Sequence, residues 1–233
     1  MNETLIELRN LTKFYGRTRA LSAVNLQLQS GQIVGLCGPN GSGKTTIIKI
    51  LNGLLHNYTG QVIIDGHKPD QHTRSLISYL PDVTYLPEWM TGKELITMFR
   101  DLYTDFDSGK MDELLARMQL DKTTRIRELS KGNKEKFQLA LVMSRRARIY
   151  ILDEPIAGVD PAAREFILDT ILNNYAEDAL LLLSTHLIAD VEKIFDSVIF
   201  LKQGEVSLFR RVDDIREQEK CSVDQLFREV FRC

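Results

Sequence analysis

The sequence has little cysteine, no long hydrophobic run and no clear excess of charge of either sign. Its 233 residues include three cysteines, which are Cys37, Cys221 and Cys233. Three cysteines at such wide spacing fit neither a disulfide framework nor a zinc site, so we expect a reducing compartment. A small scaffold held together by disulfides is excluded, and the length fits one large domain or a domain with an inserted lobe.

The longest wholly apolar stretches, such as residues 179–183, are far shorter than the roughly 18 to 20 residues that cross a bilayer. We therefore expect a soluble chain that reaches a membrane only through a partner. The 30 Lys and Arg residues are balanced by 32 Asp and Glu residues, which leaves a formal net charge of −2. Because tight nucleic-acid binding needs a basic face, we predict no nucleic-acid partner.

Two kinds of strand pattern occupy the first third of the chain. After a first strand at residues 5–9, residues 24–28 alternate between apolar and polar, as in a half-exposed antiparallel strand. Residues 33–37 are almost wholly apolar, which predicts a strand buried on both faces. Residues 61–65 alternate again and end at Asp65 in an Asp-Gly pair, a strong hairpin signal.

The middle of the chain has helical periodicity, beginning with Thr91 and Glu94 at the spacing of a capping box. From residue 149 onward, strand and helix patterns alternate, which implies a parallel sheet covered by helices. The helices are predicted from residue 91, over 110–118, over 134–148, from Pro161, over 187–195 and within 213–233. The later strands are predicted at residues 78–80, 149–152, 179–183 and 197–201.

Residues 38–45 fit the pattern in which two glycines bracket four residues and are followed by Lys and a hydroxyl residue. The glycines let backbone N–H groups turn inward around phosphates, and the following helix adds a partial positive charge. Lys44 would pair with the β- and γ-phosphates, and the hydroxyl of Thr45 would ligate Mg²⁺. The predicted nucleotide-binding residues here are Gly38, Pro39, Asn40, Gly41, Ser42, Gly43, Lys44, Thr45 and Thr46.

Asp153 and Glu154 follow directly on the apolar strand at 149–152. A parallel sheet presents such residues at its C-terminal edge, where ligands bind. Asp153 is expected to hold Mg²⁺ through water, and Glu154 to polarise the attacking water as a general base.

The segment Leu129-Ser130-Lys131-Gly132-Asn133 resembles the signature motif of ABC-type ATPases. By that resemblance, Tyr15 matches the aromatic residue that stacks on adenine, and His186 matches the switch histidine that contacts the γ-phosphate. Asp160 matches the loop that reaches across a dimer, while Ser130 and Gly132 match the residues that contact ATP held by the partner. Plainer roles exist for each, such as an N-cap for Ser130.

The resemblance implies a P-loop NTPase fold of the α/β class, with a mixed, mainly parallel sheet and an antiparallel β subdomain. The core would comprise residues 1–85 and 146–208, a helical subdomain residues 86–145, and a C-terminal helical extension residues 209–233.

The resemblance also implies an activity, in which ATP and Mg²⁺ are bound between two such domains paired as a homodimer or heterodimer. Their closure would drive a separate transmembrane permease that docks at about residues 86–127, at the inner face of the cell membrane. The pattern is similar to that of bacterial exporter-type ATPases. The alternative is a soluble ABC-type ATPase without a membrane partner, for example of the assembly type.

Two features depart from the family pattern. Asp82 stands where the family usually has Gln, and we expect it to ligate Mg²⁺ directly or through water while adding negative charge near the γ-phosphate. Within the signature, Lys131 replaces a glycine and Asn133 replaces a glutamine.

Overall fold

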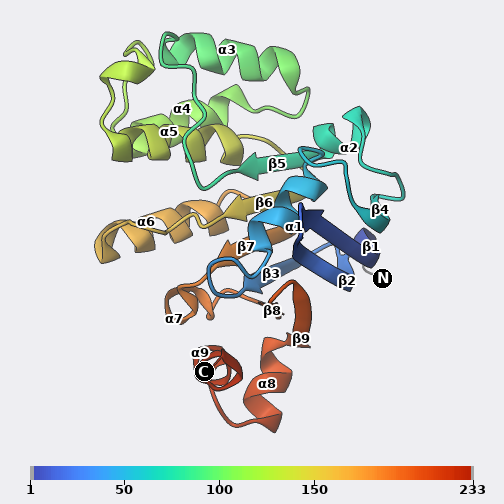
Figure 1. The fold of residues 1–233 in the computed structure, drawn as a ribbon. Coiled ribbons are helices and arrows are strands. Elements are labelled where there is room, and N and C mark those ends of the chain that lie inside the picture. The colour runs from blue at the N-terminus through green and yellow to red at the C-terminus, as the bar shows by residue number, and fades with distance from the viewer. Residues whose placement is uncertain (1–2, 232–233) are drawn as a thin grey trace.

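The strands form two sheets (Figure 1), which correspond to the two kinds of strand pattern in the sequence. The computed structural model describes residues 3–231, so Cys233 lies outside the described residues. The smaller sheet is antiparallel, has the order β2-β1-β4, and consists of β1 (Thr4–Tyr15), β2 (Thr18–Gln29) and β4 (Thr59–Ile64). The larger sheet has the order β5-β6-β7-β3-β8-β9, with β5 (Ile77–Leu80), β6 (Ile149–Asp153), β7 (Leu180–Thr185), β3 (Gln32–Cys37), β8 (Ser197–Lys202) and β9 (Glu205–Arg211). It is parallel except for β9, which confirms the mixed, mainly parallel sheet.

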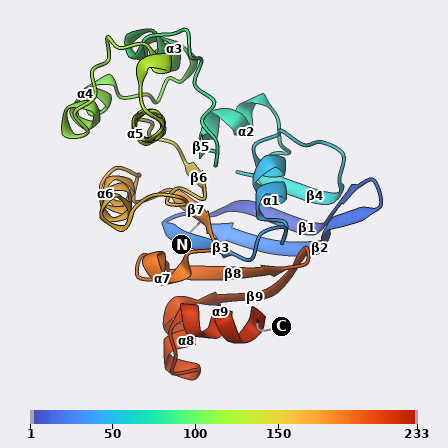
Figure 2. The same cartoon turned by 60° about the vertical axis from the view of Figure 1, so that its left-hand side comes forward.

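Helices cover both faces of the larger sheet (Figure 2). They are α1 (Lys44–Leu51), α2 (Gln71–Leu76), α3 (Gly92–Leu102), α4 (Ser108–Arg117), α5 (Lys131–Met143), α6 (Pro161–Leu172), α7 (Ile188–Val191), α8 (Val212–Gln218) and α9 (Val223–Phe231), with a 3₁₀ turn, η1 (Ile126–Glu128). We call α3, α4, η1 and α5 the helical lobe, which stands at one end of the molecule, while α8 and α9 lie at the other. The finer division of the chain into core, lobe and extension stays a prediction.

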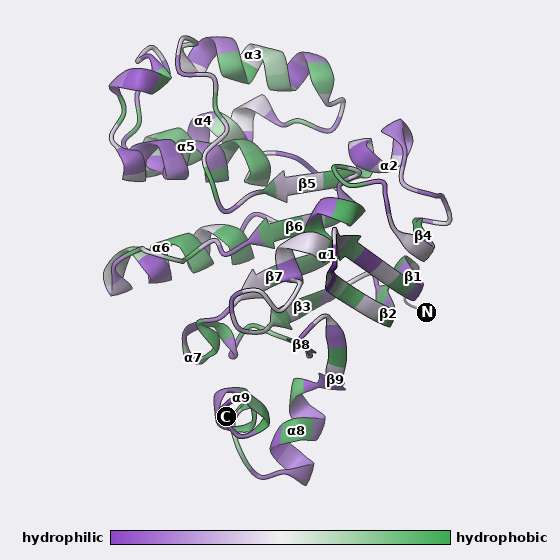
Figure 3. Cartoon of the chain, in the orientation of Figure 1, coloured by the Kyte–Doolittle hydropathy of each residue, from purple (hydrophilic) through white to green (hydrophobic). Residues whose placement is uncertain are grey.

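Side chains of the central strands alternate between two hydrophobic clusters. In β6, Tyr150 and Leu152 face the cluster shared with the helical lobe, whereas Ile149 and Ile151 face α1 and the smaller sheet. Every residue of β6 is buried, as expected for a strand covered on both faces. Figure 3 shows hydrophobic residues along β6 and hydrophilic residues along α8.

The predicted capping box starts α3. The Thr91 hydroxyl accepts from the Glu94 backbone N–H at 3.3 Å, and the Glu94 carboxylate accepts from the Thr91 N–H at 2.7 Å. Within residues 3–231 no helix has the length and apolar character needed to cross a bilayer.

Three local predictions were wrong in detail. The helix predicted over 134–148 ends at Met143, because the Arg146 N–H bonds to the Asp105 carbonyl and Arg145 pairs with residue 106 instead of continuing the helix. The helix predicted over 187–195 is only the four residues of α7, followed by turns. Asp65 does form a left-handed turn, with φ 50°, and Ile64 and His67 close it with two backbone hydrogen bonds, but this isolated bridge does not extend into a return strand, and β4 pairs with β1.

Two elements were not predicted from the sequence. The short helix α2 begins with a capping box made by Asp70 and Thr73, whose residue types differ from the usual pattern. Strand β9 adds an antiparallel edge to the larger sheet through pairing with β8.

Candidate functional site

The sheet order brings the C-terminal ends of the neighbouring parallel strands β6, β7 and β3 to one edge. Cys37 pairs in register with Thr185, and Asp153 pairs with Ser184. The phosphate loop follows β3, Asp153 ends β6, and His186 directly follows β7. Since ligands of open α/β sheets bind at this edge, the predicted catalytic residues lie where chemistry is expected.

The loop of residues 38–45 is shaped by close packing against β2 and β8. A Cβ atom at Gly38 would lie 2.5 Å from the Leu201 carbonyl oxygen, and one at Gly43 would lie 2.8 Å from the Ala20 carbonyl oxygen. Gly43 also has φ 112° and is the N-cap of α1 without a side-chain cap. The first N–H groups of α1 are therefore available to an anion, and Thr45 and Thr46 lie in its first turn.

Lys44 is buried, and its ammonium group is held close to the loop. It donates to the Gly38 carbonyl oxygen at 2.7 Å and lies 3.4 Å from Glu154 Oε1. Its side chain is only 6% exposed. The ammonium is thus fixed at the strand edge by groups that a phosphate could replace.

Asp153 is wholly buried at the end of β6. Its Oδ1 accepts from the Ser184 hydroxyl at 2.5 Å, while its Oδ2 has no hydrogen-bond partner among the described residues. Burial raises the pKa of Asp153, and the nearby charges of Asp82 and Glu154 raise it further, whereas hydrogen bonds from Ser184 and Thr45 lower it. A buried carboxylate oxygen without a partner suits a cation.

Glu154 has a strained backbone conformation, and its carboxylate lies between the Lys44 ammonium and the His186 ring. Its φ is 52°, and its backbone N–H donates to Ser184. Its Oε2 lies 2.9 Å from His186 Nδ1, and its side chain is 14% exposed. Non-glycine residues at positive φ are uncommon and concentrate at functional sites, and here the strain aims the carboxylate along the strand edge.

The donors near Asp153 fit Mg²⁺. The Thr45 hydroxyl is close enough to lower the pKa of this carboxyl group and Asp82 is close enough to raise it, so the set contains oxygen ligands only. No group of three or more His, Cys, Asp or Glu side chains among the described residues could hold a metal by itself. Mg²⁺ is usually bound through one or two protein oxygens together with nucleotide phosphates.

Tyr15 lies at the tip of the β1–β2 hairpin, two residues of which, Ala20 and Leu21, approach Gly43. Its ring is 47% exposed, and Lys13 Nζ lies 5.0 Å from the ring centroid. Lys13 is buried and donates to the Asn57 carbonyl oxygen at 2.6 Å, so it anchors the hairpin. An exposed aromatic face beside the phosphate loop can stack on a base.

Ser130, Gly132 and Asp160 lie at the starts of α5 and α6. A cavity of about 360 Å³ is lined by Gly132 and Asp160 together with Asp82 and Glu154, and Ser130 precedes it at the start of α5. Ser130 and Asp160 also cap helices, as their hydroxyl and carboxylate accept backbone N–H groups of α5 and α6. Gly132 and Asp160 thus share a cavity with Asp82 and Glu154, and the residues that line this cavity include none of the phosphate loop.

Sequence reasoning missed Ser184. It lies one strand away from Asp153 and contacts both Asp153 and Glu154, a link that depends on the β6–β7 register. Its only sequence signal was its place two residues before His186.

Comparisons with known proteins agree on one family. A family profile described as "ABC transporter" matches residues 21–157. "ABC transporter ATP-binding protein YtrB" of Bacillus subtilis (strain 168) is 31% identical over 217 residues, which cover 92% of this chain and 74% of that protein. "ABC-type transporter ATP-binding protein EcsA" of the same organism is 31% identical over 240 residues, covering 98% of this chain and 97% of that protein.

Solved structures give the same result. A "Structure of ATP binding subunit of ABC transporter" superposes with a TM-score of 0.87 at 30% identity, covering 98% of this chain and 100% of that one. A "Dimeric structure of a post-hydrolysis state of the ATP-binding cassette MJ0796 bound to ADP and Pi" superposes with a TM-score of 0.77 at 26% identity, covering 89% of this chain and 98% of that one. The chain therefore belongs to the ABC transporter family, as an ATP-binding subunit that hydrolyses ATP.

Proposed function

We propose that this chain powers an exporter-type transporter as one of two paired ATP-binding subunits that act on a separate transmembrane permease. One observation carries the proposal. The cavity that contains Gly132 and Asp160 is lined by no residue of the phosphate loop, which supports an ATP site completed by a second subunit.

In this mechanism, phosphate binding draws Lys44 away from the Glu154 carboxylate and toward the β- and γ-phosphates. Glu154, still oriented by His186, then accepts a proton from the attacking water. At the same time the oxygen of this water bonds to the γ-phosphorus. His186 would contact the γ-phosphate during this step. ADP leaves with the electron pair of the broken P–O bond.

Mg²⁺ bound at the strand edge would neutralise charge on the phosphate oxygens. Thr45 and Asp153 are the residues proposed to hold it, with Asp82 as an additional ligand. The unpartnered Oδ2 of Asp153 supports this role. The cost of burying that carboxylate is then offset when the ion is present.

The paired arrangement assigns each remaining site residue a place. The first turn of α5, with Ser130 and Gly132, would face the nucleotide of the other subunit, and Asp160 would reach across the interface. Gly132 has no heavy atom within 4 Å of the position of a Cβ, which leaves this turn open to a ligand. Tyr15 would stack on the adenine ring.

The permease is proposed to dock in a groove between the helical lobe and the core. This groove has a volume of about 500 Å³ and is lined by apolar residues and by positive charge. Leu54 is 58% exposed, Val83 64% and Tyr85 47%, which is unusual for large apolar side chains that lie together. The lining includes Leu54, Tyr79, Val83, Tyr85, Phe99, Tyr103, Lys49, Arg74 and Arg145.

Co-purification tests the proposal. The tagged chain, purified from detergent-solubilised membranes of its own cells, is expected to bring down a multi-span protein in near-equal amount. Leu54→Asp should lose that partner because it places a charge in the apolar groove. Phe209→Asp, on β9 at 40% exposure, is the matched control and should keep it. Recovery of the chain without a membrane protein would favour the soluble assembly-type alternative.

A further inference from the structure

Arg145 is a buried charged residue that the hydrolysis mechanism does not use. It lies between the end of α5 and the start of β6, where the chain passes from the helical lobe to the core. Its side chain is only 2% exposed. A buried guanidinium has to find hydrogen-bond partners, and those partners show what this arginine connects.

One set of partners belongs to the lobe. Arg145 Nε donates to Asp105 Oδ1 at 3.0 Å, and Nη2 donates to Asp105 Oδ2 at 3.0 Å, which makes a two-pronged ion pair. The guanidinium carbon also lies 3.8 Å from the centroid of the Tyr103 ring. Both partners come from the connection between α3 and α4.

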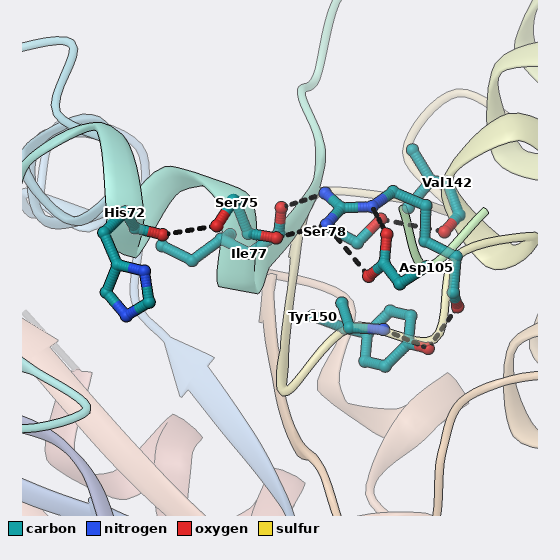
Figure 4. Close-up of polar contacts among 9 residues, drawn as sticks. His72, Ser75, Ile77, Ser78, Asp105, Val142 and Tyr150 are labelled. Carbon is teal, nitrogen blue, oxygen red and sulfur yellow. Dashed lines mark hydrogen bonds and ion pairs between the residues drawn. The ribbon is translucent and has the colours of Figure 1, made fainter. Parts of the chain in front are cut away.

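The other set belongs to the core. The same guanidinium donates to the carbonyl oxygens of Ser75 and Ile77, which lie at the junction of α2 and β5. Figure 4 shows Ser75, Ile77 and Asp105 gathered around this group. Beside it, the Ser78 hydroxyl donates to the Val142 carbonyl oxygen at 2.8 Å. This hydrogen bond joins β5 directly to α5.

The backbone of Arg145 is fixed as well. The Tyr150 hydroxyl donates to its carbonyl oxygen at 2.5 Å and accepts from the Ala147 N–H at 3.2 Å. Tyr150 is fully buried, so it offers a firm support. The guanidinium thus extends from a backbone segment that Tyr150 holds in place.

Strand β5 depends on such a support. It has four residues, forms an edge of the larger sheet, and pairs only with β6. Asp82 follows two residues after its end and lines both the groove and the cavity that contains Glu154. A short strand with one neighbour is weakly fixed, so the position of Asp82 relies on contacts outside the sheet.

We propose that Arg145 is a positioning residue for ATP hydrolysis, which ties residues 103–107 of the lobe to β5 and thereby fixes Asp82 relative to the catalytic edge. It touches neither the nucleotide site nor Glu154 and acts through β5. Its planar fork holds four acceptors at fixed angles, which a point charge on a flexible stem cannot do.

The test compares Arg145→Gln, Arg145→Lys and Asp105→Asn in the full chain. Each is expected to lower kcat about tenfold or more per ATP-binding site, with KM for ATP changed by less than about twofold. Amide hydrogen exchange in residues 77–83 should speed up in Arg145→Gln and Arg145→Lys while exchange in α1 stays as in the parent. Arg145→Lys should not restore kcat, because it keeps the charge and loses the fork.

Arg148→Gln is the matched control. Arg148 pairs with Glu3 at 2.6 Å and Asp65 at 3.2 Å, is 45% exposed, and lies three residues from Arg145. Both of these ion-pair partners lie next to strands of the smaller sheet, outside β5. It should leave kcat and the exchange of residues 77–83 unchanged.

The proposal is overturned if the Arg145 and Asp105 variants keep the parental kcat. It is also overturned if the variants lose ATP-binding sites but keep the parental kcat per remaining site, and if amide hydrogen exchange speeds up evenly over the chain. Those two results together would mean that the substitutions only destabilise the fold. If Arg145→Gln fails to fold, Arg145→Lys and Asp105→Asn decide the matter by the same criteria.

Discussion

At the scale of single residues, the catalytic edge is arranged around two neighbouring carboxylates with different surroundings. Asp153 is buried and has one oxygen without a hydrogen-bond partner among the described residues, whereas Glu154 is paired with Lys44 and His186. This difference fits two roles, a metal ligand and a base. In the proposed mechanism, the Lys44–Glu154 contact links nucleotide binding and activation of the base through one lysine.

Asp82 is the residue at which we predict a departure from the family pattern near the γ-phosphate. Asp82→Gln removes a negative charge that contributes to the raised pKa of Asp153. We expect the Mg²⁺ concentration for half-maximal ATP hydrolysis to rise by about threefold or more, because one charged oxygen ligand is lost. The measurement is a Mg²⁺ titration of the ATPase rate. Asp101→Asn, at an exposed position of α3, is the control, and an unchanged titration curve for Asp82→Gln would mean that this carboxylate is incidental.

The residues that could be predicted from sequence are those whose chemistry follows from neighbours along the chain. The phosphate loop and the pair Asp153 and Glu154 are such cases, and the structure brings them to one edge. The roles of three other residues could not be predicted in this way, because each depends on a partner far away in the sequence. Ser184 contacts a residue 31 positions away, Lys13 one that is 44 positions away, and Arg145 one that is 68 positions away.

At the scale of elements, helix starts were predicted better than helix ends. Thr91 and Glu94 are enough to start α3, since the capping groups lie within one turn. The end of α5 is set instead by contacts of residues 145 and 146 with residues 105 and 106, which no local pattern records. Strand β9 likewise exists because β8 offers it an edge.

The capping box of α3 gives a prediction for stability. Thr91→Ala removes the hydroxyl that accepts the Glu94 N–H, so unfolding should become easier by about 1 kcal/mol. Chemical denaturation measures this change, and Thr123→Ala outside the helix is the comparison. A variant as stable as the parent would show that packing alone starts the helix.

The same box has a pH dependence with a defined sign. Hydrogen bonds from the Thr91 backbone and hydroxyl lower the pKa of Glu94. The stability that this carboxylate adds is therefore present above its unfolded-state pKa and is lost as pH falls through its lower folded-state pKa. The difference between Glu94→Gln and the parent should shrink in acid.

At the scale of the whole molecule, the two sets of proposed nucleotide-binding residues belong to different elements of one chain. The phosphate loop sits between β3 and α1, and Ser130 and Gly132 sit at the start of α5 in the helical lobe. The groove between lobe and core adjoins Asp82, so a partner seated there would touch the element that leads to the catalytic edge. The proposed pairing of subunits and the proposed docking of a permease would thus be connected through Asp82, which follows β5.

The central claim, that two chains close around ATP, is tested most directly by sedimentation velocity of Glu154→Gln with and without MgATP. Without the base, hydrolysis should slow by about 10²- to 10⁴-fold, so bound ATP persists long enough to hold two chains together. We predict a monomer without nucleotide and a dimer with MgATP, while Lys44→Ala stays monomeric in both. A Glu154→Gln chain that remains monomeric at saturating MgATP would contradict the account.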